Sequence, residues 1–252
     1  MYIDTHCHLS KEDYEDIDLI IKENRESGIE KIIVSGCTKD SILESLEYAK
    51  NYDDVYVTIG YHPSEVNDIT EEDLLLLESQ ITSSSKVVGI GEIGLDYHYG
   101  KKNKELQKEI FRKQLALAEK LSLPVVIHTR DATEDTISVL KEFPNVKGDI
   151  HCFSGSVETA RIYIQMGYVL GIGGVVTFQN SNLYKVIEEI GLSSIVLETD
   201  APYLTPVPYR GKQNSSKYIP YIAKKLSEIL NISLEEVEKT TTLNAKELFD
   251  LD

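Results

Sequence analysis

The chain has 252 residues, of which 41% are hydrophobic and 27% are charged, and its formal net charge is −16. The composition is that of a globular enzyme rather than a disordered or membrane protein, and no apolar run reaches the ~18 residues that span a bilayer. The net charge argues against a protein that coats nucleic acid through a broad basic surface, but not against an enzyme that holds phosphates locally. The N-terminal segment has neither the basic nor the apolar stretch of a secretory signal, so we expect a cytoplasmic location.

Short apolar segments alternate with helical patterns along the chain. The predicted strands cover residues 2–4, 31–35, 55–59, 87–91, 124–127, 147–150, 168–172 and 195–198. The predicted helices cover residues 14–27, 41–51, 71–81, 103–121, 133–142, 157–166 and 183–190, with one or two more over 233–249. Val and Ile dominate most of the strands, as in parallel strands buried on both faces. This α/β pattern predicts a (β/α)8 TIM barrel forming one domain over residues 1–252, with a doubly wound open sheet as the alternative.

Histidines and carboxylates follow the predicted strands. These residues are His6 and His8 after the first strand, His62 after the third, Glu92 after the fourth, His128 after the fifth, His151 after the sixth and Asp200 after the eighth. In a barrel the carboxyl ends of the strands meet at the face where active sites are built, so we expect these side chains to converge.

Six of these seven residues are the predicted metal ligands. In His6-Cys7-His8 the period of two places both imidazoles on one side of an extended segment, where they suit a divalent cation. Six ligands are more than one tetrahedral ion takes, so the pattern predicts two divalent ions, with Zn, Mg and Mn as candidates. The predicted ligands are His6, His8 and Asp200 for one ion, His128 and His151 for the other, and Glu92 as a bridge.

The alternative for each ligand is a structural role. A single histidine in a buried strand is more often a hydrogen-bonded core residue than a ligand. Burying the whole set at one point without a metal would cost on the order of several kcal/mol in desolvation and repulsion, which favours the metal interpretation. Cys7 and Cys152 adjoin histidines but should face the opposite side of the chain, which disfavours a catalytic cysteine.

Six ordered motifs run along most of the chain. They are Asp4-Thr5-His6-Cys7-His8-Leu9, Gly60-Tyr61-His62-Pro63, Gly91-Glu92-Ile93-Gly94-Leu95-Asp96-Tyr97, Pro124-Val125-Val126-Ile127-His128, His151-Cys152-Phe153-Ser154-Gly155 and Leu197-Glu198-Thr199-Asp200-Ala201-Pro202-Tyr203-Leu204. In this order they resemble the TatD family of metal-dependent deoxyribonucleases. The resemblance implies a TIM barrel, two divalent metal ions and hydrolysis of DNA, often exonucleolytic. The family's ligands fall on the six positions named above, and its phosphate-contacting histidine falls on His62.

One segment departs from the family's pattern. After Asn214 the family often has an acidic residue and a proline, whereas this chain has Ser215-Ser216. We therefore expect differences in how the surrounding loop contacts substrate.

The expected reaction is hydrolysis of a phosphodiester by a hydroxide that bridges two metal ions, with Asp200 and Glu92 as catalytic residues. Asp200 is expected to orient the hydroxide and take its proton. His62 and Arg210 are expected to bind phosphate, although Arg210 also suits a structural salt bridge. Lysines near the same face are expected either to steer DNA, for example a single strand, or to be plain solvated charges. They are Lys101, Lys102, Lys104 and Lys212.

Two other functions fit the same residues. An amidohydrolase-type enzyme could use the metal pair on a cyclic amide, ester or lactone, although phosphate donors such as His62 and Arg210 favour the nuclease. A non-catalytic binding module is disfavoured, because a binder needs no complete set of ligands. No pattern in the sequence predicts a membrane partner or an obligate protein partner.

Overall fold

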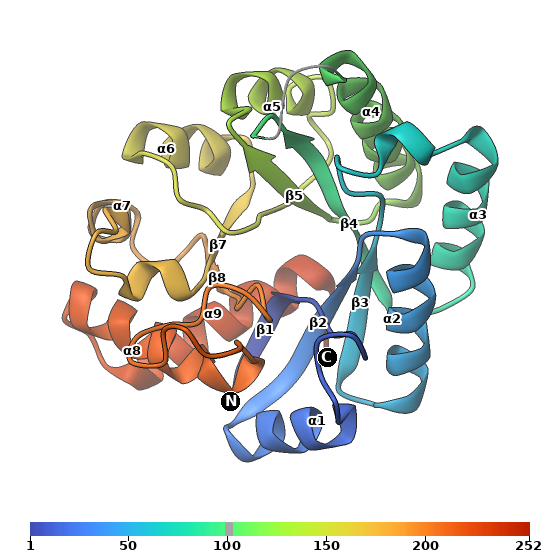
Figure 1. Cartoon of the computed structure of the whole chain (residues 1–252). Helices are drawn as coiled ribbons and strands as arrows, with labels where there is room; N and C mark the ends of the chain where they lie inside the picture. Colours follow the sequence, from blue (N-terminus) through green and yellow to red (C-terminus); the bar gives the residue numbers. More distant parts are fainter. Residues whose placement is uncertain (99–102) are drawn as a thin grey trace. The chain divides into compact units, whose positions relative to one another are not determined.

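A computed structural model describes residues 1–98 and 103–252 of the chain. Strands and helices alternate along it (Figure 1). The strands are β1 (Tyr2–Cys7), β2 (Ile29–Gly36), β3 (Val55–Ile59), β4 (Val87–Asp96), β5 (Val125–Arg130), β6 (Gly148–Ile150), β7 (Val169–Ile172) and β8 (Ile195–Leu197). The α-helices are α1 (Ile17–Glu26), α2 (Lys39–Asn51), α3 (Glu71–Thr82), α4 (Lys104–Leu121), α5 (Thr133–Leu140), α6 (Val157–Gln165), α7 (Leu183–Ile190), α8 (Ile219–Leu230) and α9 (Leu234–Phe249). Short 3-10 helices are η1 (Val66–Asp68), η2 (Gly174–Thr177) and η3 (Ser216–Tyr218).

The described strands form one eight-stranded sheet in the order β1 to β8. Hydrogen bonds also join the segment after β8 to β1. The backbone N–H groups of Thr199 and Asp200 donate to the carbonyl oxygen of His6 at 3.3 and 3.0 Å. An open doubly wound sheet would leave its first and last strands apart, so these bonds exclude that alternative. The fold is the predicted (β/α)8 TIM barrel.

The chain divides into two compact units. The terminal unit comprises Met1–Val34 and His151–Asp252, and the internal unit comprises Ser35–Ile150. That the whole chain acts as one domain stays a prediction. No helix in the described part of the chain has both the length and the apolar composition needed to cross a membrane.

In the terminal unit, α8 and α9 (red in Figure 1) lie beside β1 and β8. Helix α8 was not predicted, although its sequence carries a signal, because Pro220 stands in its first turn where the missing N–H is tolerated. Its apolar face is buried through Ile222 and Leu226. Helix α9 begins as predicted, since the Ser233 hydroxyl accepts a hydrogen bond from the N–H of Glu236 at 3.1 Å.

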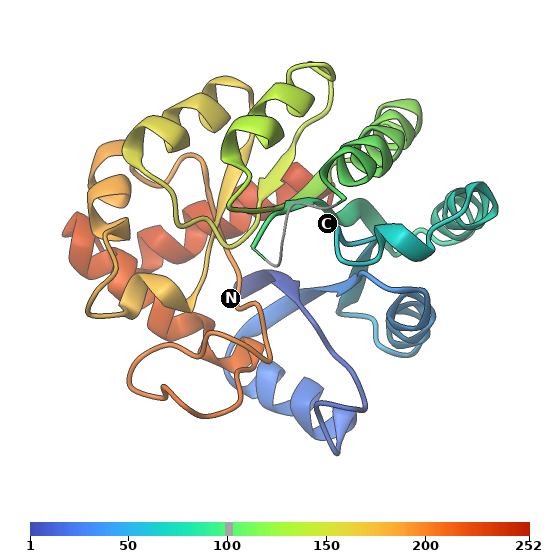
Figure 2. The same ribbon diagram turned by 45° about the horizontal axis from the view of Figure 1, so that its top comes forward.

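In the internal unit, helices α2 to α5 follow one another along the outside of strands β3 to β5 (Figure 2). Helix α4 packs on β4 through Ile110, Phe111 and Leu115, which are at most 3% exposed. The same face carries two buried glutamines, Gln107 and Gln114. Their amides hydrogen-bond to the backbone at the carboxyl ends of β4 and β3, as described below.

Strands β4 and β5 extend beyond their predicted ends. Glu92 and His128 therefore lie within these strands instead of following them. The pairing of β4 with β5 shifts between Ile90 and Ile93, where β4 carries one more residue than its partner. Such a bulge re-aims a side chain within a strand, and here the affected stretch contains Glu92. Sequence patterns predicted the apolar part of each strand and missed the polar continuation.

Gly94 allows β4 to run close to β5 just after this bulge. Its φ is +145°, and a Cβ built there would lie 2.0 Å from the carbonyl oxygen of His128. We expect Gly94→Ala to lower the free energy of unfolding by about 2–4 kcal/mol through backbone strain and steric overlap, measured by urea denaturation.

Gly28→Ala is the matched control. Gly28 also has a positive φ of +81°, but nothing lies within 4 Å of the added Cβ. Gly28→Ala should lower the free energy of unfolding by about 1–2 kcal/mol, which is the cost of the left-handed backbone alone. Equal losses in the two variants would show that the close approach to His128 contributes nothing.

Candidate functional site

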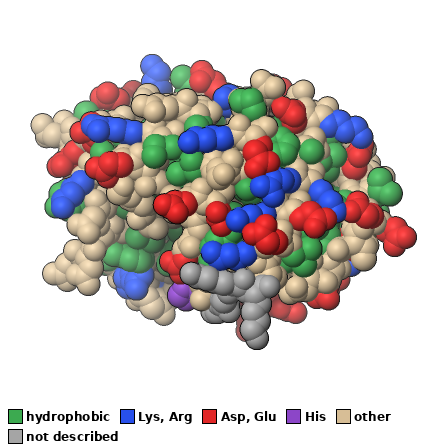
Figure 3. All heavy atoms as spheres, turned by 90° about the horizontal axis from the view of Figure 1, so that it is seen from above, with side chains coloured by type: hydrophobic (Ala, Val, Ile, Leu, Met, Phe, Trp, Pro, Cys, Tyr) green, Lys and Arg blue, Asp and Glu red, His purple; other side chains and the backbone are tan. Residues whose placement is uncertain are grey.

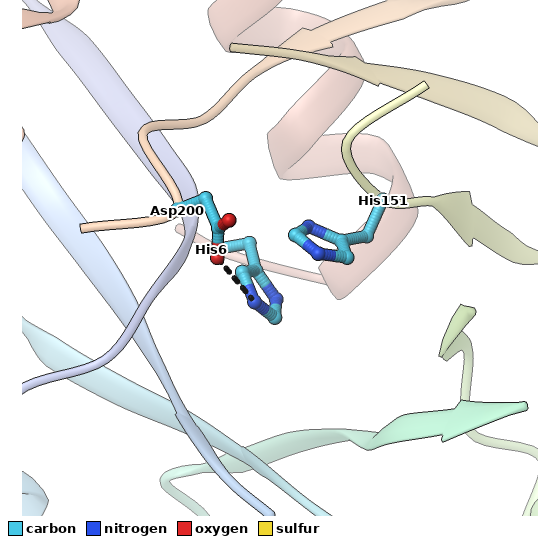
Figure 4. Close-up of side chains that lie close together, drawn as sticks. All are labelled: His6, His151 and Asp200. Carbon is cyan, nitrogen blue, oxygen red and sulfur yellow. Dashed lines mark ion pairs between the residues drawn. The ribbon is translucent and has the colours of Figure 1, made fainter. Parts of the chain in front are cut away.

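Three predicted ligands of the first ion converge in the terminal unit. The Nε2 atoms of His6 and His8 lie 3.3 Å apart, and Oδ1 of Asp200 lies 3.8 and 3.6 Å from them. His6 lies within a register shift of β1, between Asp4 and Cys7, where β1 carries one more residue than β2. Figure 4 shows His6 and Asp200 facing one another, with the imidazole of His151 on the other side of His6.

The spacing of these atoms fits a metal ion. A point equidistant from the two imidazole nitrogens and the Asp200 oxygen lies about 2.1 Å from each, within the ~2.0–2.2 Å of Zn–N and Zn–O bonds. Two nitrogens and one carboxylate oxygen are also a common donor set for a catalytic zinc. The backbone fixes this arrangement, because His6 and Asp200 are joined by the hydrogen bond between their main chains.

His151 also belongs to the terminal unit and stacks on His6. The two ring centroids are 3.8 Å apart, and His6, His151 and Asp200 each offer a ligand atom within 4.8 Å of the others. Nδ1 of His151 lies 3.3 Å from both carboxylate oxygens of Glu198. An N–H donated from Nδ1 to Glu198 orients the ring and makes Nε2 the nitrogen that would bind a cation.

Glu198 was not predicted as a site residue. It is fully buried and accepts a hydrogen bond from the N–H of Cys152 at 2.6 Å. Burial raises the pKa of its carboxyl group, while the charge and hydrogen bond of His151 act in the opposite direction. The available signal was its position two residues before Asp200, at the end of the predicted eighth strand.

A second buried acid, Asp4, ties β1 to the segment after β8. Its carboxylate accepts hydrogen bonds from the N–H and the hydroxyl of Thr199 at 3.0 and 2.6 Å. Burial raises its pKa to about 7, although the hydrogen bonds from Thr199 and Ser216 lower it. Ser215 and Ser216, where the chain departs from the family's pattern, are both buried. The two serines that depart from the family's pattern therefore belong to the buried contacts around Asp4 and do not form an exposed loop surface.

The internal unit brings together a second set of predicted residues. Nδ1 of His128 lies 2.6 Å from Oε1 of Glu92, and Nε2 of His128 lies 3.2 Å from Oδ2 of Asp96. The His62 ring packs edge-on against His128, with centroids 4.4 Å apart. His62, Asp96 and His128 each offer a ligand atom within 4.8 Å of the others.

The donors of this second set suit a divalent cation, but their spacing differs from that of the first. A separation of 2.6 Å is that of a charge-assisted hydrogen bond, whereas two ligands of one tetrahedral ion lie roughly 3.4 Å apart. Glu92 and His128 would have to move apart slightly to share an ion. Burial raises the pKa of Asp96, but hydrogen bonds from His128 and the N–H of His98 outweigh it and leave that pKa below its usual value.

The contacts of His62 favour a proton donor over a ligand. Its Nδ1 accepts a hydrogen bond from the N–H of Ser64 at 3.1 Å, so a neutral ring carries its proton on Nε2. That Nε2 lies 3.8 Å from Oε1 of Glu92. The two buried glutamines of α4 hold this region, because the Gln114 amide bonds to the backbone of Tyr61 and the Gln107 amide to that of Asp96.

Arg210 lies in the loop after β8. Its guanidinium lies over the Phe178 ring, 3.8 Å from the ring centroid, and this cation–π contact helps to hold it. Lys104 and Lys212 likewise lie over tyrosine rings, Tyr97 at 3.8 Å and Tyr209 at 5.5 Å. Lys101 and Lys102 fall outside the described residues.

Cys7, between the two histidines, faces away from them as predicted. Its thiol contacts the carbonyl oxygen of Ile33 at 3.7 Å, and burial raises its pKa well above the usual value. A thiol held in this way is a poor nucleophile.

Although the net charge of the chain is −16, acidic side chains do not form a single cluster on the face shown in Figure 3. Acidic and basic side chains are interspersed there, with hydrophobic groups between them. A face of mixed sign is neither a broad basic platform for nucleic acid nor a barrier to it.

Comparisons with known proteins agree with this description. The family described as TatD related DNase matches residues 3–250. The uncharacterized metal-dependent hydrolase YabD of Bacillus subtilis is 43% identical over 256 residues, covering 100% of both chains. Another relative, YcfH of Escherichia coli K12, is 33% identical and covers 99% of this chain and 96% of its own. The crystal structure of the TatD homologue YjjV of Escherichia coli superposes with a TM-score of 0.91 at 30% identity, covering 100% of this chain and 98% of that one.

Replacing His6 and His8 together by Ala should remove about one equivalent of bound divalent metal, because it deletes two of three converging donors. Metal content is measured by elemental analysis of protein loaded with Zn²⁺ or Mn²⁺ and then desalted. His98→Ala is the control, since His98 is half exposed and pairs with Asp131. Equal metal content in the double variant and the parent would contradict the assignment.

Proposed function

Because this chain belongs to the TatD family of metal-dependent hydrolases, we propose that it hydrolyses phosphodiester bonds in DNA with the help of two divalent metal ions. The observation that carries the proposal is the match of the family described as TatD related DNase to residues 3–250. The mode of cleavage we favour is exonucleolytic.

We assign the ligands as two groups. His6, His8 and Asp200, whose spacing fits an ion, hold the first metal. His128 and His151 would hold the second, and Glu92 would be shared between the two ions. Support comes from the donor types, two imidazoles and a carboxylate for each ion, and from Glu198, which orients His151 through its Nδ1. Zn, Mg and Mn are the candidate ions.

Paired divalent cations lower the pKa of a water molecule and neutralise phosphate charge when bound. In the proposed reaction Asp200 orients the attacking water and accepts one of its protons. The water oxygen bonds to phosphorus as the bond from phosphorus to the leaving sugar oxygen breaks. The leaving oxygen takes up a proton, and the products are an alcohol and a phosphate monoester. The short backbone link from Asp200 to His6 keeps this carboxylate from swinging away.

His62 and Arg210 bind the phosphate in this proposal. The tautomer of His62 places a proton on Nε2, which makes that atom a donor to a phosphate oxygen. Arg210 lies over the Phe178 ring, so its guanidinium loses little freedom when it binds an anion. Neither residue is needed to hold a metal.

The deciding experiment incubates metal-loaded protein with end-labelled single-stranded and duplex DNA and sizes the products on a gel. Stepwise shortening from one end is expected. A panel of cyclic amides, esters and lactones tests the amidohydrolase alternative under the same conditions. The nuclease proposal is wrong if the protein cleaves the small compounds efficiently but leaves DNA intact with each of Zn²⁺, Mg²⁺ and Mn²⁺. If activity on either class of substrate is unchanged after the metal is removed with a chelator, that reaction does not depend on metal.

Asp200→Asn should lower turnover of DNA by about 10² or more, because it keeps the shape of the side chain but removes the base and one negative charge. Turnover is measured at saturating oligonucleotide with metal content checked in parallel. Asp131→Asn is the control, since that carboxylate is exposed and pairs only with the surface residue His98 among the contacts described. A drop of only a few-fold in Asp200→Asn would make Asp200 a structural residue.

His62→Ala and Arg210→Ala should each raise the barrier in kcat/KM by about 1.5–3 kcal/mol, the scale of a hydrogen bond to a charged group, without loss of metal. Lys212→Ala serves as control for Arg210, because it removes a neighbouring cation from the same loop. If the parent cleaves DNA and neither variant differs from it, the nuclease stands and the phosphate site is wrong.

A further inference from the structure

The loop after β8 exposes a large aromatic side chain. Among the described residues, the large hydrophobic side chains that are exposed lie on helices, with Met1, Tyr203 and Val207 as the exceptions. Met1 is the first residue, whereas the other two belong to this loop. Tyr203 is 60% exposed, so water covers much of its ring and a partner that covered the ring would be favoured by the hydrophobic effect.

Tyr203 lies next to a candidate metal ligand. Its ring centroid is 6.5 Å from that of His8, with an interplanar angle of 66°. The backbone N–H of Tyr203 also donates to the carbonyl oxygen of Asp200 at 2.8 Å. The exposed ring is therefore attached to the same short segment that supplies Asp200, within reach of a single nucleotide bound at that ligand set.

A buried asparagine holds the loop beneath this ring. Asn214 is fully buried, and its side-chain amide donates to the carbonyl oxygens of Thr199 and Tyr203 at 2.8 and 2.5 Å. The N–H of Asn214 donates to the carbonyl oxygen of Pro202 at 3.0 Å. Because the backbone on both sides of Tyr203 is already fixed, stacking a partner on the ring orders little more of the chain.

We propose that Tyr203 is a stacking platform for one nucleobase of a DNA single strand whose phosphodiester lies at the His6, His8 and Asp200 group. The inference rests on the proposed function and adds to it a contact with the base instead of the phosphate. Aromatic rings bind bases of any sequence through their π-faces, so the platform favours unpaired over paired ends without selecting a sequence. A duplex end keeps its bases stacked on one another and must be frayed before it can use the ring.

The absence of tryptophan from this chain makes the proposal directly measurable. Tyr203→Trp keeps an aromatic platform and introduces the sole indole fluorophore. The metal-loaded variant is titrated with a short oligothymidylate carrying phosphorothioate linkages, which resist cleavage, and with an abasic strand of the same length. Stacking should quench the indole emission with the base-bearing strand and leave it unchanged with the abasic strand.

Tyr184→Trp is the matched control, because Tyr184 is 42% exposed but lies on α7. Its emission should not change with either strand. A binding measurement by fluorescence anisotropy of labelled strands completes the set. Tyr203→Ala should bind the base-bearing strand about tenfold more weakly and the abasic strand equally well, and Tyr203→Phe should restore the parent affinity.

The outcomes separate this inference from the proposed function. If DNA is bound and cleaved but the indole at position 203 is not quenched, the platform is wrong and the nuclease stands. If the parent neither binds nor cleaves DNA, both proposals fall together. If the indole emission of Tyr203→Trp changes with protein concentration in the absence of DNA, a second copy of the chain covers this ring. That result would overturn the proposal that a nucleobase stacks on it.

Discussion

The hydrogen bonds that join the His6 backbone to Thr199 and Asp200 determine where the first group of candidate ligands lies. Two N–H groups from the segment after β8 donate to the carbonyl oxygen of His6, and the carboxylate of Asp4 accepts from the same N–H of Thr199 and from its hydroxyl. These contacts are buried, where an unsatisfied partner would be costly. They hold the imidazole of His6 and the carboxylate of Asp200 close together, and the same segment carries Tyr203.

Much of the fold could be predicted from the sequence because buried parallel strands have a strong composition. The predicted ranges of β3 and α7 agree with the structure to the residue. The predicted ends of β4 and β5 were too early, since both strands continue through polar residues that no apolar pattern includes. The bulge at Glu92 arises from the pairing of two strands, and a single sequence contains no direct signal for register.

The site was predicted unevenly, for a related reason. Ligand types at strand ends pointed to His6, His8 and Asp200, which the structure brings together, and spacing alone indicated that the first two share a side. Asp96, which belongs to one of the six motifs, contacts His128. The supporting roles of Glu198 and Asp4 were not predicted. The sequence alone does not show whether an acidic residue in an apolar strand faces the site or accepts a hydrogen bond from the backbone. Which ions are held, and whether Glu92 bridges them, remain predictions.

The link between Asp4 and Thr199 also constrains the order of events during synthesis. The two residues are separated by 195 positions, so β1 leaves the ribosome long before its partner segment exists. Until then the amino-terminal strand has only β2 to pair with, and its buried carboxylate has no N–H or hydroxyl from Thr199 to bind. The pairing carries the entropy cost of closing a very long loop. The group of His6, His8 and Asp200 therefore cannot assemble until the segment after the eighth strand has been translated.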